Sequence, residues 1–288
     1  MITRLARFLL PLLLVGVCHA QQVVDPEFKP IVEQPTFTKN FPRVLFDEGH
    51  NNALTRMGRY KPFADLIELD GYQIVLGRKI VNRETLDTFK IFVIVDPLGA
   101  EDVDDQGAEK PAFADNECDA VREWVKAGGS LLLIADGPPF ASAAEIMAKR
   151  FGVDFGKADV KEAGNQQTAT SNWISYSREN KLLLDHPITA GRNDAEKINR
   201  VVTYGAQSLK AGEGSSIFLK LPADQGDVAQ GVAIRFGKGR VVVLGESAML
   251  SAQVTLPDRT PMGINSANDN KQLALNIMHW LSGLLKER

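Results

Sequence analysis

Cysteine is nearly absent from this sequence of 288 residues, which contains only Cys18 and Cys118. Residues 1–20 combine two arginines, a short apolar run and the small residues typical of a signal-peptidase site, so we expect cleavage after Ala20. Cleavage would remove Cys18 and leave Cys118 alone, which excludes an internal disulfide in the mature protein. The exported chain must then be stable through its hydrophobic core.

Long hydrophobic runs are also lacking. The apolar run Phe8–Val17 contains Pro11 and is shorter than the ~20 residues that a membrane-spanning helix needs. We therefore expect a periplasmic or secreted protein with no transmembrane span after signal cleavage. Lipoprotein anchoring through Cys18 is a less favoured alternative, because Val17 is bulky where a lipoprotein signal has a small residue.

Basic runs are missing as well. The chain has 33 Lys and Arg against 36 Asp and Glu, and loss of the two arginines in the signal changes the net charge from −3 to −5. Nucleic-acid binding proteins carry clustered positive charge that neutralises phosphates. This composition therefore predicts no nucleic-acid partner.

The motifs of several enzyme classes are not found. The sequence has no GxSxG nucleophile turn, no Walker loop, no GxGxxG and no HExxH. The turn where a nucleophile would be expected reads Ala135-Asp136-Gly137-Pro138-Pro139, with neither Cys nor Ser. We predict no nucleotide, no other cofactor and no bound metal, and we expect no glutaminase activity.

Hydrophobic periodicity in the first half indicates strands that alternate with helices. Expected strands are 44–47, 72–76, 91–95 and 131–135, and expected helices are 56–69, 83–89, one that ends at 128–129, and 141–150. This order is typical of a parallel sheet with right-handed crossovers. The predicted class is α/β, a doubly wound and mostly parallel sheet with helices on both faces.

The second half is less regular. After an extended leader (21–40), we predict one domain (41–288) with a polar insertion at about 153–200. Strands are expected at 201–208, 215–221, 231–236 and 240–244, with a hairpin turn at 237–239. A helix at 269–285 closes the chain.

Acidic residues follow four of the expected strands. Asp47-Glu48, Asp96, Asp136 and Glu246 would meet in one crevice if these strands were parallel and adjacent. Grouped carboxylates raise one another's pKa values or hold a cation. The alternative is that each acid only caps the helix or turn that follows it.

His50 follows the first of these strands and could act as a general base, a metal ligand or a hydrogen-bond donor to a substrate. It could equally be a structural histidine held by Asn51 or by a nearby carbonyl. The candidate catalytic residues are His50, Glu48 and Asp136. The predicted ligand-binding set comprises Asp47, Glu48, His50, Asn51, Asp96, Asp136, Glu246 and Ser247.

Five segments, in this order, resemble the class I glutamine amidotransferase-like superfamily. They are Phe46–Asn51, Trp124–Asp136, His186–Ile188, Gly245–Ser247 and Asp269–Leu281. The resemblance is greatest to the branch shared by gliding-motility transporter-associated proteins and the N-terminal domain of an intraflagellar transport subunit. It implies a flavodoxin-like sheet in a domain that has generally lost the amidotransferase cysteine.

These observations predict an exported, non-amidotransferase binding module of the cell envelope. It would recognise a small polar ligand, a glycan or a partner protein at the carboxyl edge of the sheet, and Trp173 and Tyr176 could close over a sugar ring. The alternative is a hydrolase that uses His50 with Glu48 or Asp136 as acid and base, with or without a metal ion. A third hypothesis is a scaffold whose contacts lie on residues 165–177.

Overall fold

The computed structural model describes residues 22–159, 173–205, 207–222 and 228–285. The predicted signal peptide and residues 165–172 of the polar insertion lie outside the described residues. A nine-stranded sheet forms the centre, in the order β3-β2-β4-β5-β12-β11-β9-β6, and β10 pairs with β11. Its strands are β2 (Arg43–Asp47), β3 (Gln73–Gly77), β4 (Ile91–Val95), β5 (Ser130–Ile134), β6 (Val153–Asp159), β9 (Gln207–Ala211), β10 (Ser215–Lys220), β11 (Ala229–Phe236) and β12 (Gly239–Leu244).

Five neighbouring strands, β3, β2, β4, β5 and β12, are parallel, whereas β11, β9, β6 and β10 join through antiparallel pairs. The central strands β4 and β5 are buried along their whole length, which explains their uninterrupted apolar sequence. The hairpin expected at 237–239 joins β11 to β12, with Phe236 paired to Gly239. The mostly parallel sheet predicted from the sequence is confirmed.

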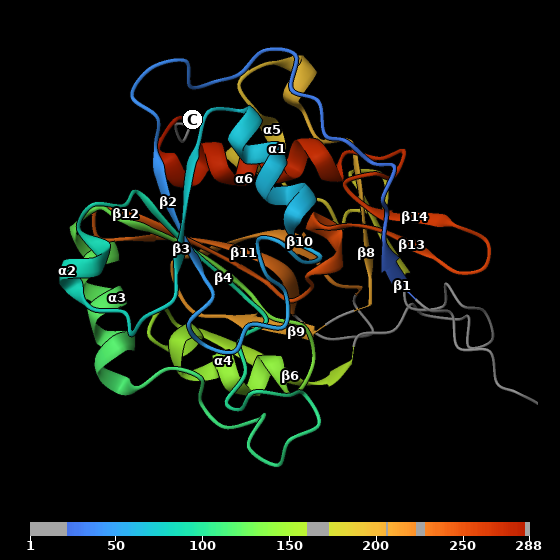
Figure 1. Ribbon diagram of the computed structural model, residues 1–288. Helices are drawn as coiled ribbons and strands as arrows, with labels where there is room; N and C mark the ends of the chain where they lie inside the picture. The colour runs from blue at the N-terminus through green and yellow to red at the C-terminus, as the bar shows by residue number, and fades with distance from the viewer. Residues whose placement is uncertain (1–21, 160–172, 206, 223–227, 286–288) are drawn as a thin grey trace, which may run out of the picture.

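Helices cover both faces of this sheet, as predicted. Figure 1 shows α1 (Lys61–Leu69) and α6 (Asn270–Ser282) above it, and α3 (Asp115–Ala127) and α4 (Phe140–Lys149) below it. Because side chains alternate along a strand, Val93 packs toward α1 and α6 while Phe92 packs toward α3 and α4. The sheet therefore separates two hydrophobic cores.

Several predicted helices are shorter than expected. The helix predicted over 56–69 begins at Lys61, because residues 56–60 form turns and Pro62 is suited to a first helical turn. Residues 83–89 form only one turn of helix, α2 (Arg83–Leu86), which Asn82 caps through its side chain. None of the helices in the described ranges is long and apolar enough to cross a membrane.

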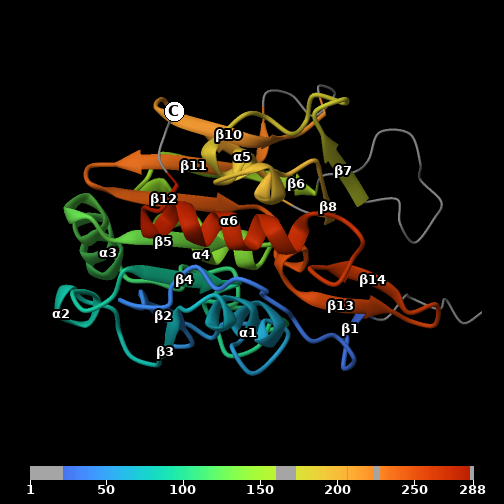
Figure 2. The ribbon, with the colours of Figure 1, turned by 90° about the horizontal axis from the view of Figure 1, so that it is seen from above.

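The region predicted as an insertion contributes to the sheet. Its first part is β6, which pairs with β9 at the sheet edge, and its later part forms β7 (Trp173–Ser177) and the short helix α5 (Pro187–Ala190). β7 pairs with β8 (Arg200–Tyr204), so the strand predicted over 201–208 is divided between β8 and β9. Figure 2 shows α5 beside α6.

The segment predicted as an extended leader is attached to the domain at two places. β1 (Gln22–Val24) pairs with β13 (Ala252–Thr255), which pairs with β14 (Thr260–Gly263) in a small separate sheet that the sequence did not indicate. Farther along, the Phe37 ring packs against Tyr72 with 5.0 Å between centroids. Residues 22–40 are therefore part of the folded structure.

Candidate functional site

Four acid-bearing strands lie side by side in the parallel part of the sheet. β2, β4, β5 and β12 are consecutive neighbours and run in the same direction. Their C-terminal ends therefore lie at one edge, here called the carboxyl edge. Asp47, Asp96, Asp136 and Glu246 all occur there, but hydrogen bonds divide them into two clusters.

The first cluster, here called the His50 cluster, contains Asp47, His50 and Glu117. The Nδ1 atom of His50 lies 2.9 and 3.0 Å from the two carboxylate oxygens of Asp47, and its Nε2 atom lies 3.1 Å from Oε1 of Glu117. All three residues are buried, with exposed fractions of 1%, 6% and 5%. The imidazole thus joins the end of β2 to the first turn of α3.

Glu117 is the member of this cluster that the sequence analysis missed. Its Oε2 accepts a hydrogen bond from the backbone N–H of Ala114, and its Oε1 accepts one from Val81. A glutamate in the first turn of a helix commonly bonds the helix start in this way. A helix that connects two parallel strands begins at the carboxyl edge of the sheet. The place of Glu117 in the first turn of such a helix could therefore have indicated that it lies near His50.

The charges in the His50 cluster stabilise one another. Burial alone would lower the pKa of His50, but its bonds to Asp47 and Glu117 outweigh burial and raise that pKa above 6.5. Burial would raise the pKa of Glu117, whereas bonds from Ala114, Val81 and His50 lower it overall. An imidazolium that donates both ring N–H groups to carboxylates has no ring nitrogen left for a substrate.

The second cluster, here called the Asp136 cluster, contains Asp96, Asp136, Glu246 and Ser247. Asp96 accepts a hydrogen bond from the backbone N–H of Asp136 at 2.8 Å. Asp136 accepts two from Ser247, 2.6 Å from its backbone nitrogen and 2.7 Å from its hydroxyl. Glu246 accepts bonds from the N–H groups of Ala248 and Met249, in the short 3₁₀ helix Ala248–Leu250.

The acids of the Asp136 cluster hold their protons more tightly than ordinary carboxyls. Burial, followed by the charge of Asp136, raises the pKa of Asp96 well above 3.8 and that of Glu246 well above 4.5. Burial also raises the pKa of Asp136 itself. Tyr60 lies beneath them and donates its hydroxyl to the carbonyl of Ser247 at 2.8 Å. Asp96 and Glu246 are buried, whereas Asp136 is half-buried at the edge.

Two predicted ligand-binding residues belong to neither cluster. Glu48 accepts a hydrogen bond from the backbone N–H of Arg56 at 3.0 Å and forms an ion pair with Arg78 at 3.4 Å. Asn51 is exposed and has a left-handed backbone with φ 50°, a conformation that asparagine tolerates better than most residues. The structure therefore brings His50 to Asp47, and Asp136 to Ser247, but not all eight side chains to one pocket.

The predicted clamp of Trp173 and Tyr176 over a sugar ring is not formed. Tyr176 is fully buried and hydrogen-bonds Gln230, whereas Trp173 packs edge-on against Tyr204 with 4.8 Å between centroids. The two residues are three positions apart on β7, so their side chains point to opposite faces. Trp173 and Tyr204 border a small cavity of about 410 Å³ on one face of the β7–β8 pair.

Cys118 is not placed for nucleophilic chemistry. The side chain is buried in the core beneath α3, and burial raises the pKa of its thiol to about 12. A thiol with so high a pKa is almost entirely protonated at neutral pH and is a poor nucleophile.

Comparison with known proteins supports the fold and does not extend to a function. No family model matches the sequence, and no curated protein matches it. Among solved structures, the chain is similar to the "mmIFT52 N-terminal domain", with a TM-score of 0.61 and 13% identity over 83% of this chain and 97% of that one. A cytoplasmic protein from Salmonella typhimurium, STM3548, matches with a TM-score of 0.52 and 13% identity over 84% of this chain and 99% of its own.

A second cytoplasmic protein from Salmonella typhimurium LT2, STM1381, matches with a TM-score of 0.51 and 14% identity over 85% of this chain and all of its own. Identities this low establish a shared architecture only. Together with the sheet order and the helices on both faces, these matches show that the chain has a flavodoxin-like, glutamine amidotransferase-like fold.

Proposed function

We propose that this protein is an exported, non-enzymatic binding module of the cell envelope that recognises its ligand at the carboxyl edge of the sheet. The observation that carries the proposal is the bonding of Asp136. It occupies the turn after β5, where a nucleophile would be expected, and both of its carboxylate oxygens accept hydrogen bonds from Ser247. A side chain engaged in this way stabilises the edge and does not attack a substrate.

Hydrogen bonds within each of the two clusters hold the carboxyl edge in a fixed arrangement, which also supports a role in binding. A binding surface that is already ordered loses little conformational entropy when a ligand binds. Between and around the clusters, the exposed groups at this edge include Asn51, Arg59 and Pro138. These residues are the ones that a ligand can reach without breaking the hydrogen bonds beneath them.

A partner protein is the ligand class that this geometry favours over a small polar molecule or a glycan. None of the three cavities described in the structure includes a member of either cluster, although Arg59, which is exposed at this edge, also lines the second of them. Small molecules are usually bound in concave sites that bury most of their surface. An edge with exposed polar groups over a rigid base is better suited to a macromolecule.

The hydrolase hypothesis is less well supported. It requires His50 to exchange a proton with substrate while Glu48 or Asp136 orients it. Glu48 instead bonds Arg56 and Arg78, Asp136 bonds Ser247, and both nitrogens of His50 face other carboxylates. Turnover of an ester, amide or glycoside substrate that disappears in His50→Gln would favour the hydrolase over the binding module.

The proposal is tested by affinity capture from the envelope fraction of the source organism with the full chain as bait. We expect the double variant Asn51→Gly/Arg59→Ala to lose roughly tenfold or more of the captured partner, because a few central residues carry most of the binding energy at an interface. Glycine suits the left-handed backbone of residue 51, so this substitution does not strain the turn.

Lys126→Ala is the matched control, since this exposed lysine lies in the last turn of α3, at the opposite edge of the sheet. It should capture as much partner as the unmodified chain. Equal capture by the double variant and by Lys126→Ala would show that the carboxyl edge is not the binding surface.

A further inference from the structure

The cavity of about 410 Å³ beside β7 and β8 is a separate candidate site. Side chains of both strands line it, together with Pro261 of β14 and residues 266–268 of the loop that precedes α6. None of its lining residues belongs to the His50 cluster or to the Asp136 cluster. This space is here called the β7–β8 cavity.

Strand alternation explains which side chains line the cavity. β7 and β8 are antiparallel, with Trp173 opposite Tyr204 and Ser175 opposite Val202. Alternate residues of a strand share one face, so these four side chains lie on the same face as that of Arg200. The intervening residues of β7 are buried in the hydrophobic core. The face that lines the cavity is therefore the one turned toward solvent.

One part of the cavity is aromatic. Trp173 and Tyr204 are both partly exposed, and their rings pack edge to face. The hydroxyl of Ser266 donates to the carbonyl of Pro261 and lies 2.9 Å from the hydroxyl of Tyr204, which is therefore the donor in that bond. Aromatic rings that are already fixed offer an apolar surface for the C–H groups of a sugar ring, with little loss of conformational entropy.

Arg200 places a positive charge close to these rings. Its Nε–H donates to the hydroxyl of Ser175 at 3.0 Å. Ser175 follows Trp173 by two residues, which is about 7 Å along a strand. The guanidinium and the indole are therefore separated by a distance comparable with the length of one sugar ring that carries a carboxylate.

The guanidinium of Arg200 is accessible to a ligand. The side chain is exposed, and no carboxylate pairs with it in the part of the chain that the structure describes. Asp269 instead accepts the backbone N–H groups of Asn199 and Arg200. None of the described residues that line the cavity is acidic. The two Nη atoms of an arginine match the two oxygens of a carboxylate, so the cavity is suited to this group.

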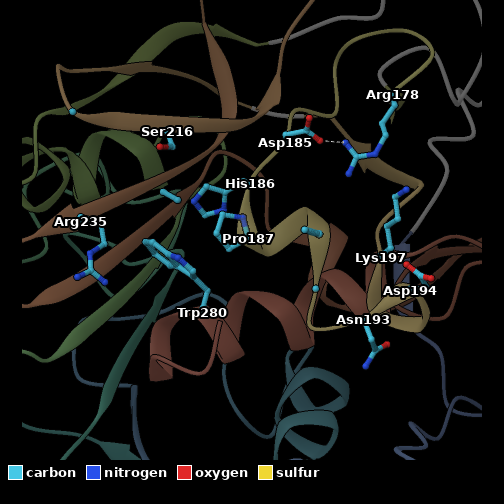
Figure 3. Close-up of a pocket in the computed structure, with 14 residues that line it drawn as sticks. Arg178, Asp185, His186, Pro187, Asn193, Asp194, Lys197, Ser216, Arg235 and Trp280 are labelled. Atoms are coloured by element: carbon cyan, nitrogen blue, oxygen red, sulfur yellow. Dashed lines mark hydrogen bonds and ion pairs between the residues drawn. The ribbon is translucent and has the colours of Figure 1, made fainter. Parts of the chain in front are cut away.

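The cavity beside α5 and α6, of about 950 Å³, is of a different kind. Acidic and basic side chains both line it, and Figure 3 shows Arg178 paired with Asp185. Asp194 is a second acid in its lining. An anionic ligand would compete with these carboxylates for the cations there. We therefore expect such a ligand to prefer the β7–β8 cavity.

We propose that the β7–β8 cavity binds a sugar that carries a carboxylate, such as a uronic acid. The carboxylate would accept hydrogen bonds from Arg200, and a C–H face of the sugar ring would pack on Trp173. This site is independent of the partner proposed for the carboxyl edge and is tested separately.

The test uses the full chain and measures affinity by calorimetry for glucuronate, galacturonate, glucose and acetate. We expect at least one uronate to bind, and glucose and acetate to bind at least about tenfold more weakly. Glucose lacks the charge-assisted hydrogen bonds, and acetate lacks the ring that packs on the indole. Failure of both uronates to bind at millimolar concentration, or equal binding of glucose or acetate, would overturn the proposal.

Two variants at accessible positions locate the bound sugar. Arg200→Gln removes the charge but keeps a hydrogen-bond donor, and Trp173→Leu removes the aromatic surface but stays apolar. Each should weaken uronate binding by roughly tenfold, with the midpoint of denaturant unfolding unchanged. Arg178→Gln makes the same change at the cavity of Figure 3 and should leave the affinity unchanged, as should Asn51→Gly/Arg59→Ala. Undiminished binding by both Arg200→Gln and Trp173→Leu, or a loss in Arg178→Gln alone, would show that the sugar binds elsewhere.

Discussion

Replacement of His50 by alanine should lower the free energy of unfolding by about 3–5 kcal/mol near neutral pH, the usual cost of removing one partner from a buried ion pair. The imidazole lies between the carboxylates of Asp47 and Glu117 and bonds both of them. Without it, two buried carboxylates would face a cavity. Denaturant unfolding of the unmodified and variant chains measures the difference directly.

The same variant should change the pH dependence of stability. Since the folded-state pKa of His50 lies above 6.5, its contribution is fully present below 6.5 and is lost as the pH rises through the folded value. Since the pKa of Glu117 lies below 4.5, its contribution is present above 4.5 and is lost as the pH falls through the lower value. The difference between the two chains should therefore be largest between these values.

Asn51→Gly is the control for this experiment, because it alters an exposed neighbour of His50 and suits the local backbone. Its effect on stability should be below about 1 kcal/mol. A comparably small loss in His50→Ala, or a difference that does not vary with pH, would contradict the ionic account of the His50 cluster.

Replacement of His279 by alanine should also destabilise the fold by about 3–5 kcal/mol, again because a buried carboxylate loses its partner. His279 on α6 lies 2.7 Å from Asp70, and both residues are 1% exposed. Asp70 also accepts a hydrogen bond from the backbone N–H of Thr36 at 2.8 Å. The pair of Asp70 and His279 therefore attaches the segment before β2 to the domain. Chemical unfolding again supplies the measurement.

His279→Gln should recover part of the loss, because the glutamine amide can donate to Asp70 from a similar distance. Protease digestion adds a second readout: cleavage near Thr36 should accelerate in His279→Ala and return toward normal in His279→Gln. Equal stability of the alanine and glutamine variants would indicate that packing, and not the hydrogen bond to Asp70, accounts for the effect.

The sequence predicted the parallel half of the fold well, since its central strands are continuous apolar runs separated by amphipathic helices. Ile91–Val95 is an example whose bounds agree with the structure. The antiparallel half was harder to predict, because β6 at the sheet edge and its neighbour β9 pair with partners that are distant in the sequence. β13 and β14 have little alternation of polar and apolar residues, and the sequence analysis missed them.

The candidate site was predicted only in part. The predicted strand order correctly placed the four acids at one edge of the sheet. Which acids contact each other depends on local hydrogen bonds, which the sequence did not predict. Glu117 is 67 positions from His50, so only its place in the first turn of a crossover helix could have indicated that the two lie close together.

We infer that His50 is a positively charged link between Asp47 and Glu117 and does not exchange a proton with a substrate. Nuclear magnetic resonance of isotope-labelled histidine tests it, with His50→Gln used to assign the signals. We predict that at neutral pH both ring nitrogens of His50 carry protons that exchange slowly with water, and that the ring loses a proton only at a pH above its ordinary value of 6.5. A neutral ring at neutral pH, with one nitrogen open to solvent, would contradict the account.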